Sequence, residues 1–257
     1  FKYFNFFLDS WISLIGLLGY NIKSTSTLYF ILPVGISFYT FQTLSYTIDV
    51  YNNKLKPCNS FISFATFVSM FPQLVAGPIE RATNLLPQIE SSRIFSKEKI
   101  IKGLNLILWG LFKKIVVADS LAPLVDRIFE NPTIYDGGTL FLGLFYFTFQ
   151  IYCDFSGYSD IAIGTAKCIG FEFKTNFYYP YFSKNIMDFW RKWHISLSSW
   201  FRDYVFIPLG GSKVSNKKFI RNILAVFLIS GLWHGANWTF VFWGLCHASI
   251  YFITKFF

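Results

Sequence analysis

The chain has 257 residues, of which 53% are hydrophobic, 22% aromatic and only 14% charged. Soluble domains carry about 25% charged residues, and a soluble core of this size does not hide so much apolar surface. The composition therefore predicts a protein whose solvent is largely the lipid bilayer, and it argues against a soluble enzyme.

The net charge of +9 has an uneven distribution along the chain. Basic residues gather in three connecting segments, at 81–102, 184–202 and 213–221. Such connectors are typical of cytoplasmic loops, and no nucleic-acid partner is expected. The segment 126–136 holds three acids and one arginine. We therefore expect Lys97, Lys184 and Lys217 to face the cytoplasm and Asp136 to face the other side.

Apolar runs of about 20 residues, the length that crosses a bilayer, recur along the chain. They predict helical spans at 27–48, 61–79, 103–125, 137–153, 220–233 and 238–257. Pro33 is expected to kink the first run, and Pro72 to break the second so that it dips into the membrane and returns. The third run contains Lys113 and Lys114, whose side chains must reach the boundary or face protein.

The predicted fold class is therefore all-α, a polytopic integral membrane protein. No repeat or linker divides the chain, so residues 1–257 are expected to form a single membrane domain. The first residue is not methionine and the last run is apolar, so we interpret the chain as an internal piece of a longer one.

The segment 185–211, "NIMDFWRKWHISLSSWFRDYVFIPLGG", differs from these runs. Aromatic and apolar residues recur at helical spacing among Arg191, Lys192 and Arg202, which predicts an amphipathic helix along the membrane boundary that ends at "PLGG". On such a helix, Arg191 and Ser198 would share a face with His194. That histidine could then bind a phosphorylated or carboxylate-bearing donor, and a solvated interfacial side chain fits the spacing equally well.

Asp154 and Asp160 lie in "QIYCDFSGYSDIAIG", which we interpret as the end of a span. Carboxylates there need partners, and the basic side chains of 185–211 are the expected ones. The prediction for both aspartates is a structural, charge-paired role.

His234 is one of only three histidines and lies in the apolar "GLWHGANW". An ionisable side chain within the bilayer is rare and marks a functional site. Gly231 and Gly235 leave room for a ligand or another helix beside the ring, and Trp238 would follow one helical turn later. The alternative is a structural histidine at a helix–helix contact.

The sequence carries no recognisable metal or nucleotide motif. His234 and His247 would point about 220° apart around an ideal helix, and the four cysteines lack metal-ligand or disulfide spacing. No metal site is therefore predicted, and His247 is expected to be structural. The absence of GxSxG, P-loop and GxGxxG patterns argues against serine hydrolases, ATPases and dinucleotide enzymes.

Several stretches together carry a family resemblance. These are "PVGISFYTFQTLSYTIDVY", "FPQLVAGPIERATNLLPQI", "IYCDFSGYSDIAIG", "FWRKWHISLSSWFRDYVFIPLGG" and "GLWHGANWTFVFWGLCHA". They resemble the membrane-bound O-acyltransferase family, in particular its bacterial branch that O-acetylates alginate and peptidoglycan. Teichoic-acid D-alanyl transfer proteins share the WHxSLS and WHG elements, but "IPLGG" followed by a basic loop fits the acetyltransferase branch better.

The resemblance implies a ring of transmembrane and re-entrant helices in the bacterial cytoplasmic membrane. It implies acetyl transfer from a cytoplasmic donor, acetyl-CoA, to an exported polysaccharide through a periplasmic partner protein, with no tightly bound cofactor. His234 matches the family's near-invariant histidine and His194 its second active-site position. The residues of the motif around His234 are Trp233, Gly235 and Trp238.

In that chemistry a base removes the hydroxyl proton of the acceptor, and neutral imidazole suits this role near pH 7. Burial of His234 would favour its neutral form. Arg191, Lys192 and Arg202 could hold the phosphates of acetyl-CoA. The sequence is compatible with a covalent acyl-histidine intermediate and with direct transfer. An alternative function is a transporter or flippase that moves the acyl donor or glycan without acyl-transfer chemistry.

Overall fold

The computed structural model describes residues 2–20 and 33–256, and these consist of helices joined by loops, as the all-α prediction requires. The chain forms two compact units. The first comprises Phe1–Ile36, Asn185–Met187 and Trp200–Phe257, and the second comprises Ser37–Lys184 and Asp188–Ser199.

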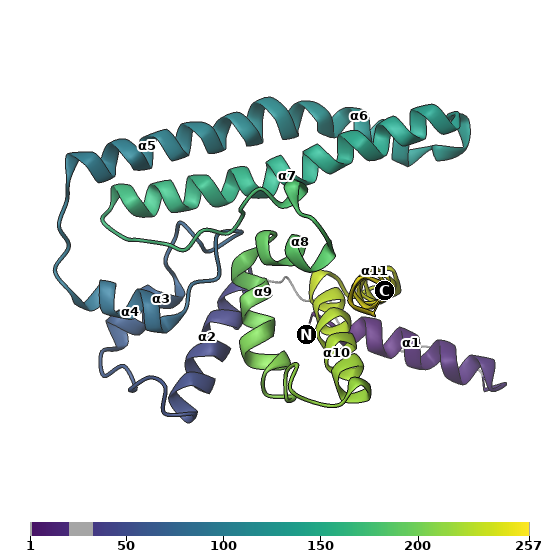
Figure 1. Cartoon of the computed structure of the whole chain (residues 1–257), viewed down its shortest axis with the longest axis horizontal. Coiled ribbons are helices and arrows are strands. Elements are labelled where there is room, and N and C mark those ends of the chain that lie inside the picture. The colour runs from purple at the N-terminus through teal and green to yellow at the C-terminus, as the bar shows by residue number, and fades with distance from the viewer. Residues whose placement is uncertain (1, 21–32, 257) are drawn as a thin grey trace. The chain divides into compact units, whose positions relative to one another are not determined.

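The helices follow one another along the chain (Figure 1). The first unit contains α1 (Phe4–Leu17), η4 (Arg202–Phe206), α10 (Asn216–His234) and α11 (Trp238–Phe256). The second contains α2 (Ile36–Tyr51), α3 (Phe61–Val68), α4 (Ala82–Glu90), α5 (Lys97–Leu111), η1 (Phe112–Ala118), α6 (Asp119–Glu130), η2 (Pro132–Ile134), α7 (Gly137–Cys168) and η3 (Pro180–Phe182). The short helices α8 (Ile186–Lys192) and α9 (Ile195–Phe201) belong mostly to the second unit.

In the second unit, α7 lies alongside the continuous helical run of α5, η1 and α6 (Figure 1). Ser96 caps α5 and Asp136 caps α7, each accepting a backbone N–H of the first turn. A Cβ added to Gly103 would collide with the carbonyl of Gly164, so only glycine permits this close approach of the two backbones.

The helix α7 is longer than predicted, because it continues without a break from the predicted span 137–153 through the stretch 150–164. The stretch 150–164 therefore belongs to the same helix as the predicted span. Farther along, α7 contributes Ile163 and Ala166 to the hydrophobic core of this unit. The other core residues come from the α3–α4 region and the segment after α7: Phe67, Met70, Ala82, Leu85, Leu86, Phe171 and Phe173.

The predicted spans coincide with helices to different degrees. Residues 27–32 of the first lie outside the described part, and α2 begins only at Ile36. In the second, α3 ends at Val68 and turns follow through Pro72, so the predicted break is confirmed. Among residues 2–20 and 33–256, no helix combines the length and the apolarity needed to cross a membrane.

The segment 185–211 is not one continuous helix, so this prediction is wrong. Helix α8 ends at Lys192, and His194 adopts a left-handed backbone with a φ of 44° before α9 begins. The reason is an outside acceptor: Asn176 takes the backbone N–H groups of Ile195 and Ser196 on its backbone and side-chain oxygens, respectively. A continuous helix would have directed these groups to its own carbonyls. The turn at "PLGG" is present as expected.

Candidate active site

His194 is buried in the second unit, with only 3% of its surface exposed. Its Nδ1 lies 3.2 Å from Oδ1 of Asn176, and the edge of the Phe155 ring packs against it at a centroid distance of 4.6 Å. The alternative prediction, that His194 is a solvated side chain at the membrane interface, is therefore wrong. Because the helix breaks at His194, the predicted shared face with Arg191 and Ser198 does not form, and Arg191 is exposed on α8.

Asn176 is fully buried and connects His194 to α7. Its Oδ1 accepts the backbone N–H of Ser196 at 3.2 Å and the Ser196 hydroxyl at 2.8 Å. Its Nδ2 donates to Oγ of Ser159 on α7 at 3.1 Å. Ser196 Oγ in turn accepts the backbone N–H of Ile79 at 3.0 Å. Every polar atom of the Asn176 side chain thus has a partner, as a buried amide requires.

Side chains on α4 and just before it form hydrogen bonds with the backbone of residues 172–174, the segment that leads to Asn176. Glu80 accepts the backbone N–H of Lys174, and Gln88 both accepts the N–H of Glu172 and donates to its carbonyl. Asn84 donates to Glu80 at 2.7 Å. Burial raises the pKa of Glu80, while the hydrogen bonds from Lys174 and Asn84 oppose that shift.

His234 ends α10 in the first unit and has an exposed side chain. Its ring packs against Trp233 at 4.8 Å and Trp243 at 5.1 Å between centroids, and Phe240 lies 6.5 Å away. The residue is exposed at the helix end, but loss of hydration among these aromatic rings lowers the pKa of His234 to about 4 and favours the neutral imidazole, as expected. Exposure at a helix end leaves the imidazole accessible to a reactant.

Gly231 and Gly235, the glycines of the motif around His234, allow close approach of α11. A Cβ on Gly231 would collide with the carbonyl oxygen of Phe240, and one on Gly235 would collide with the Phe240 ring. The room predicted beside His234 is thus filled by α11. Trp238 does not follow one turn later on the same helix, because α10 ends at His234.

Trp238 and Trp233 instead connect this region to the N-terminal part of the unit. Trp238 packs on Phe6 at 5.4 Å, and its Nε1 donates to Oγ of Ser10 at 3.1 Å. The Trp233 carbonyl accepts Lys2 Nζ at 3.0 Å. Both tryptophans therefore contact α1 or the residues before it.

His247 lies on α11 and contacts the ring of Trp243. The ring of Trp243 is 4.5 Å from His247 and 5.1 Å from His234, so the two histidines share a neighbour. The 220° separation predicted for one continuous helix is wrong, because the chain leaves the helix between them. Within residues 2–20 and 33–256, no group of three or more His, Cys, Asp or Glu side chains is placed to hold a metal ion.

Substituting Gly231 by alanine should destabilise the first unit by about 1–3 kcal/mol, because the new methyl group overlaps the α11 backbone. The thermal unfolding midpoint in detergent measures this effect. The matched control is Gly16→Ala on α1, where a Cβ has open space and should cost nothing. An equal midpoint for Gly231→Ala and the parent protein would show that the α10–α11 approach is looser than described.

Asp154 and Asp160 are paired within the second unit, as a structural role requires, but with other partners than predicted. Asp160 Oδ2 lies 2.7 Å from Lys113 Nζ, and Asp154 Oδ1 lies 2.6 Å from Lys114 Nζ. Lys113 is buried and also donates to Oγ of Ser156 at 3.0 Å. Both lysines therefore face protein, which is one of the two alternatives predicted for them. The prediction that the two aspartates pair with basic residues of 185–211 is wrong.

The three basic residues predicted to hold phosphates differ in their surroundings. Lys192 pairs with Asp188 at 2.8 Å and Arg202 with Asp203 at 2.8 Å, while Arg191 is exposed. Neighbouring carboxylates partly neutralise two of them, which weakens their predicted contribution to binding an anion.

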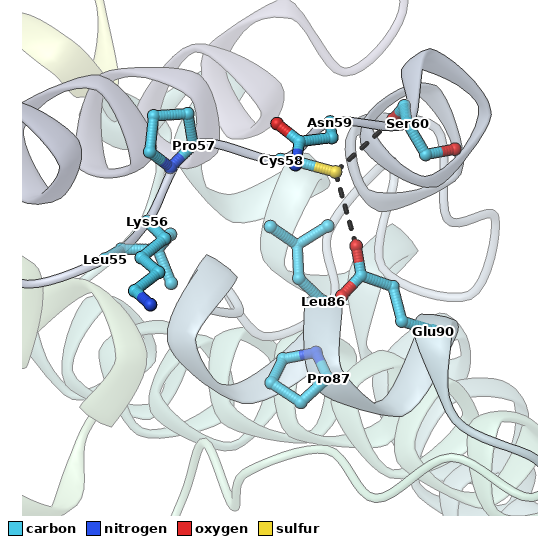
Figure 2. A pocket seen from close by; sticks show the side chains of 9 residues that line it. All are labelled: Leu55, Lys56, Pro57, Cys58, Asn59, Ser60, Leu86, Pro87 and Glu90. Atoms are coloured by element: carbon cyan, nitrogen blue, oxygen red, sulfur yellow. Dashed lines mark hydrogen bonds between the residues drawn. The ribbon is translucent and has the colours of Figure 1, made fainter.

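The second unit also contains a pocket (Figure 2). It is lined by Leu55, Lys56, Pro57, Cys58, Asn59, Ser60, Leu86, Pro87 and Glu90. Cys58 donates to the Ser60 carbonyl at 3.3 Å and to Glu90 at 3.4 Å. None of the predicted site residues lines it.

Asn176, which contacts His194 and Ser196, is the residue of this region that sequence reasoning missed. It follows α7 in a stretch with no periodic pattern, "FEFKTNFYY", and nothing local distinguishes it from a loop asparagine. Asn176 and His194 are 18 positions apart in the sequence, and only the tertiary fold brings Asn176 into contact with residues 194–196.

The model of the membrane-bound O-acyltransferase family matches residues 55–257. The chain is 44% identical to the "Probable alginate O-acetylase AlgI" of Azotobacter vinelandii over 97% of the chain and 49% of that protein. It is 39% identical to the "Peptidoglycan O-acetyltransferase" of Helicobacter pylori, over 96% of the chain and 51% of that protein. It is 30% identical to the "Teichoic acid D-alanyltransferase" of Bacillus subtilis, over 84% of the chain and 57% of that protein.

The chain thus spans about half the length of the curated relatives it matches. Both histidine motifs, around His194 and His234, fall inside the matched residues. The chain belongs to the membrane-bound O-acyltransferase family.

Proposed function

We propose that the protein carrying this chain is a membrane O-acetyltransferase that serves the O-acetylation of an exported polysaccharide. The observation that carries the proposal is 44% identity over 97% of the chain to a protein described as an alginate O-acetylase, with a peptidoglycan O-acetyltransferase at 39%. The donor is acetyl-CoA on the cytoplasmic side, and the acceptor is an alginate-like polymer or peptidoglycan.

The setting we propose is the bacterial cytoplasmic membrane. There the helices of the complete protein form a polytopic ring, and a periplasmic partner protein receives the acetyl group. The low charge content and the clustering of basic residues in connectors support this setting.

In this reaction His234 is the base that takes the proton of the acceptor hydroxyl group as its oxygen attacks the thioester carbonyl. The new C–O bond replaces the C–S bond, and the proton passes from His234 to the departing CoA thiolate. Its position at the exposed end of α10, bordered by Trp233 and Trp243, supports access for both reactants. His194, buried and held by Asn176, contributes to positioning the reactants.

A second candidate is D-alanyl transfer to teichoic acid, which the 30% identity to the Bacillus subtilis protein favours. It uses the same type of acyl transfer with a different acyl group. The two candidates therefore differ in donor and acceptor, and an assay with both donors separates them.

The test supplies the complete protein, in sealed lipid vesicles, with acetyl-CoA carrying a labelled acetyl group. We expect cleavage of the thioester and movement of label to protein or polysaccharide acceptor, and no reaction with a D-alanyl carrier protein. Transfer of D-alanine alone would favour the second candidate. Label that crosses sealed vesicles without thioester cleavage would contradict acyl transfer and identify a transporter.

A further inference from the structure

Asn176 contacts three consecutive residues at the break between α8 and α9. Its backbone carbonyl accepts the N–H of Ile195 at 2.8 Å, and its side chain contacts both Ser196 and the imidazole of His194. His194 keeps a left-handed backbone, φ 44°, which is unfavourable for a residue with a Cβ. Asn176 thus holds the strained residue by main chain and side chain together.

The hydrogen bonds determine which way the Asn176 amide points. A backbone N–H can only donate, so the side-chain atom that receives the Ser196 N–H must be the amide oxygen. The amide nitrogen then faces Ser159 Oγ, which accepts from it at 3.1 Å. No flipped orientation satisfies both contacts.

This orientation determines the tautomer of His194. Nδ1 of the ring lies 3.2 Å from the same amide oxygen, which has no hydrogen to give, so Nδ1 must carry one. Ser196 Oγ, 3.4 Å from Nδ1, already donates to Asn176 at 2.8 Å and accepts from Ile79. In a neutral imidazole with hydrogen on Nδ1, Nε2 is the nitrogen that accepts.

We propose that Asn176 is a positioning residue that holds His194 in the Nδ1–H tautomer, in which Nε2 is the ring nitrogen that accepts hydrogen bonds. The effect of this tautomer on acetyl transfer rests on the proposed function. The tautomer itself rests only on the hydrogen bonds of Asn176. The side chains of Glu80, Asn84 and Gln88 support Asn176 by holding the backbone of 172–174.

Nitrogen NMR of the complete protein, labelled with ¹⁵N-histidine in nanodiscs, tests this. His194→Gln identifies the His194 signals by their loss. In the parent protein, Nδ1 should carry hydrogen and Nε2 should not. Asn176→Leu should shift the ring toward the Nε2–H form, which free histidine prefers, and lower acetyl transfer by roughly 10-fold, less than the ~10²-fold lower limit for the loss of a general base. Asn176→Asp keeps an acceptor oxygen and should keep hydrogen on Nδ1.

The matched control is Asn84→Leu, the same substitution at a residue that anchors the same segment without contacting the ring. It should leave hydrogen on Nδ1 of His194. An Nε2–H tautomer in the parent protein would overturn the proposal without any variant, and so would an unchanged tautomer in folded Asn176→Leu. If the parent protein shows the Nδ1–H form but transfers no acetyl group, the proposed function fails and the hold of Asn176 on His194 stands.

Discussion

Replacing His234 by alanine should abolish most acetyl transfer while leaving the amount of folded protein close to that of the parent. Its ring is exposed at the end of α10, so removing it creates no buried cavity. The loss of one general base lowers the rate by about 10²–10⁴-fold, equivalent to ~3–5 kcal/mol of barrier. Label transfer from acetyl-CoA, measured with membrane level and protease resistance, gives both quantities.

The other two histidines serve as comparisons for His234. His247→Ala should have little effect on transfer, because His247 packs beside Phe227 and Trp243 and is expected to be structural. His194→Ala should be milder than His234→Ala in the chemical step and should reduce stability as well, since it empties a buried position. Near-normal turnover by well-folded His234→Ala protein would show that His234 is not the base.

Replacing Lys113 by methionine should lower the free energy of unfolding by about 3–5 kcal/mol, because it leaves the carboxylate of Asp160 without its partner in a largely buried position. The side chain of Lys113 is 9% exposed, so water cannot replace it efficiently. Reversible denaturant titration in detergent micelles measures the effect.

Two variants separate this charge pairing from a general effect of losing a lysine. Lys114→Met removes the adjacent lysine, which pairs with Asp119 and Asp154 but is 38% exposed, and should cost less than about 1 kcal/mol. The double variant Lys113→Met with Asp160→Leu should recover most of the loss, because no unpaired charge remains. An equal effect of Lys113→Met and Lys114→Met would contradict the importance of burial.

The sequence by itself determined the helical class, the family and the two histidine motifs. Composition and apolar runs are properties of the chain alone, and "WRKWHISLSSW" and "GLWHGANW" are contiguous stretches that can be identified without a fold. Helix breaks at local signals were also predictable: Pro72 follows the end of α3, and "PLGG" follows the last turn of η4.

Only the tertiary structure decided the surroundings of those motifs. Helical periodicity places residues around one helix, so it predicted a continuous helix through His194, and this prediction is wrong. It failed because Asn176, distant in sequence, provides acceptors that replace the helix's own carbonyls. The partners of Asp154 and Asp160 were missed for the same physical reason: Lys113 and Lys114 reach them across two packed helices, and the strength of a buried charge pair depends on that packing, which no local pattern encodes.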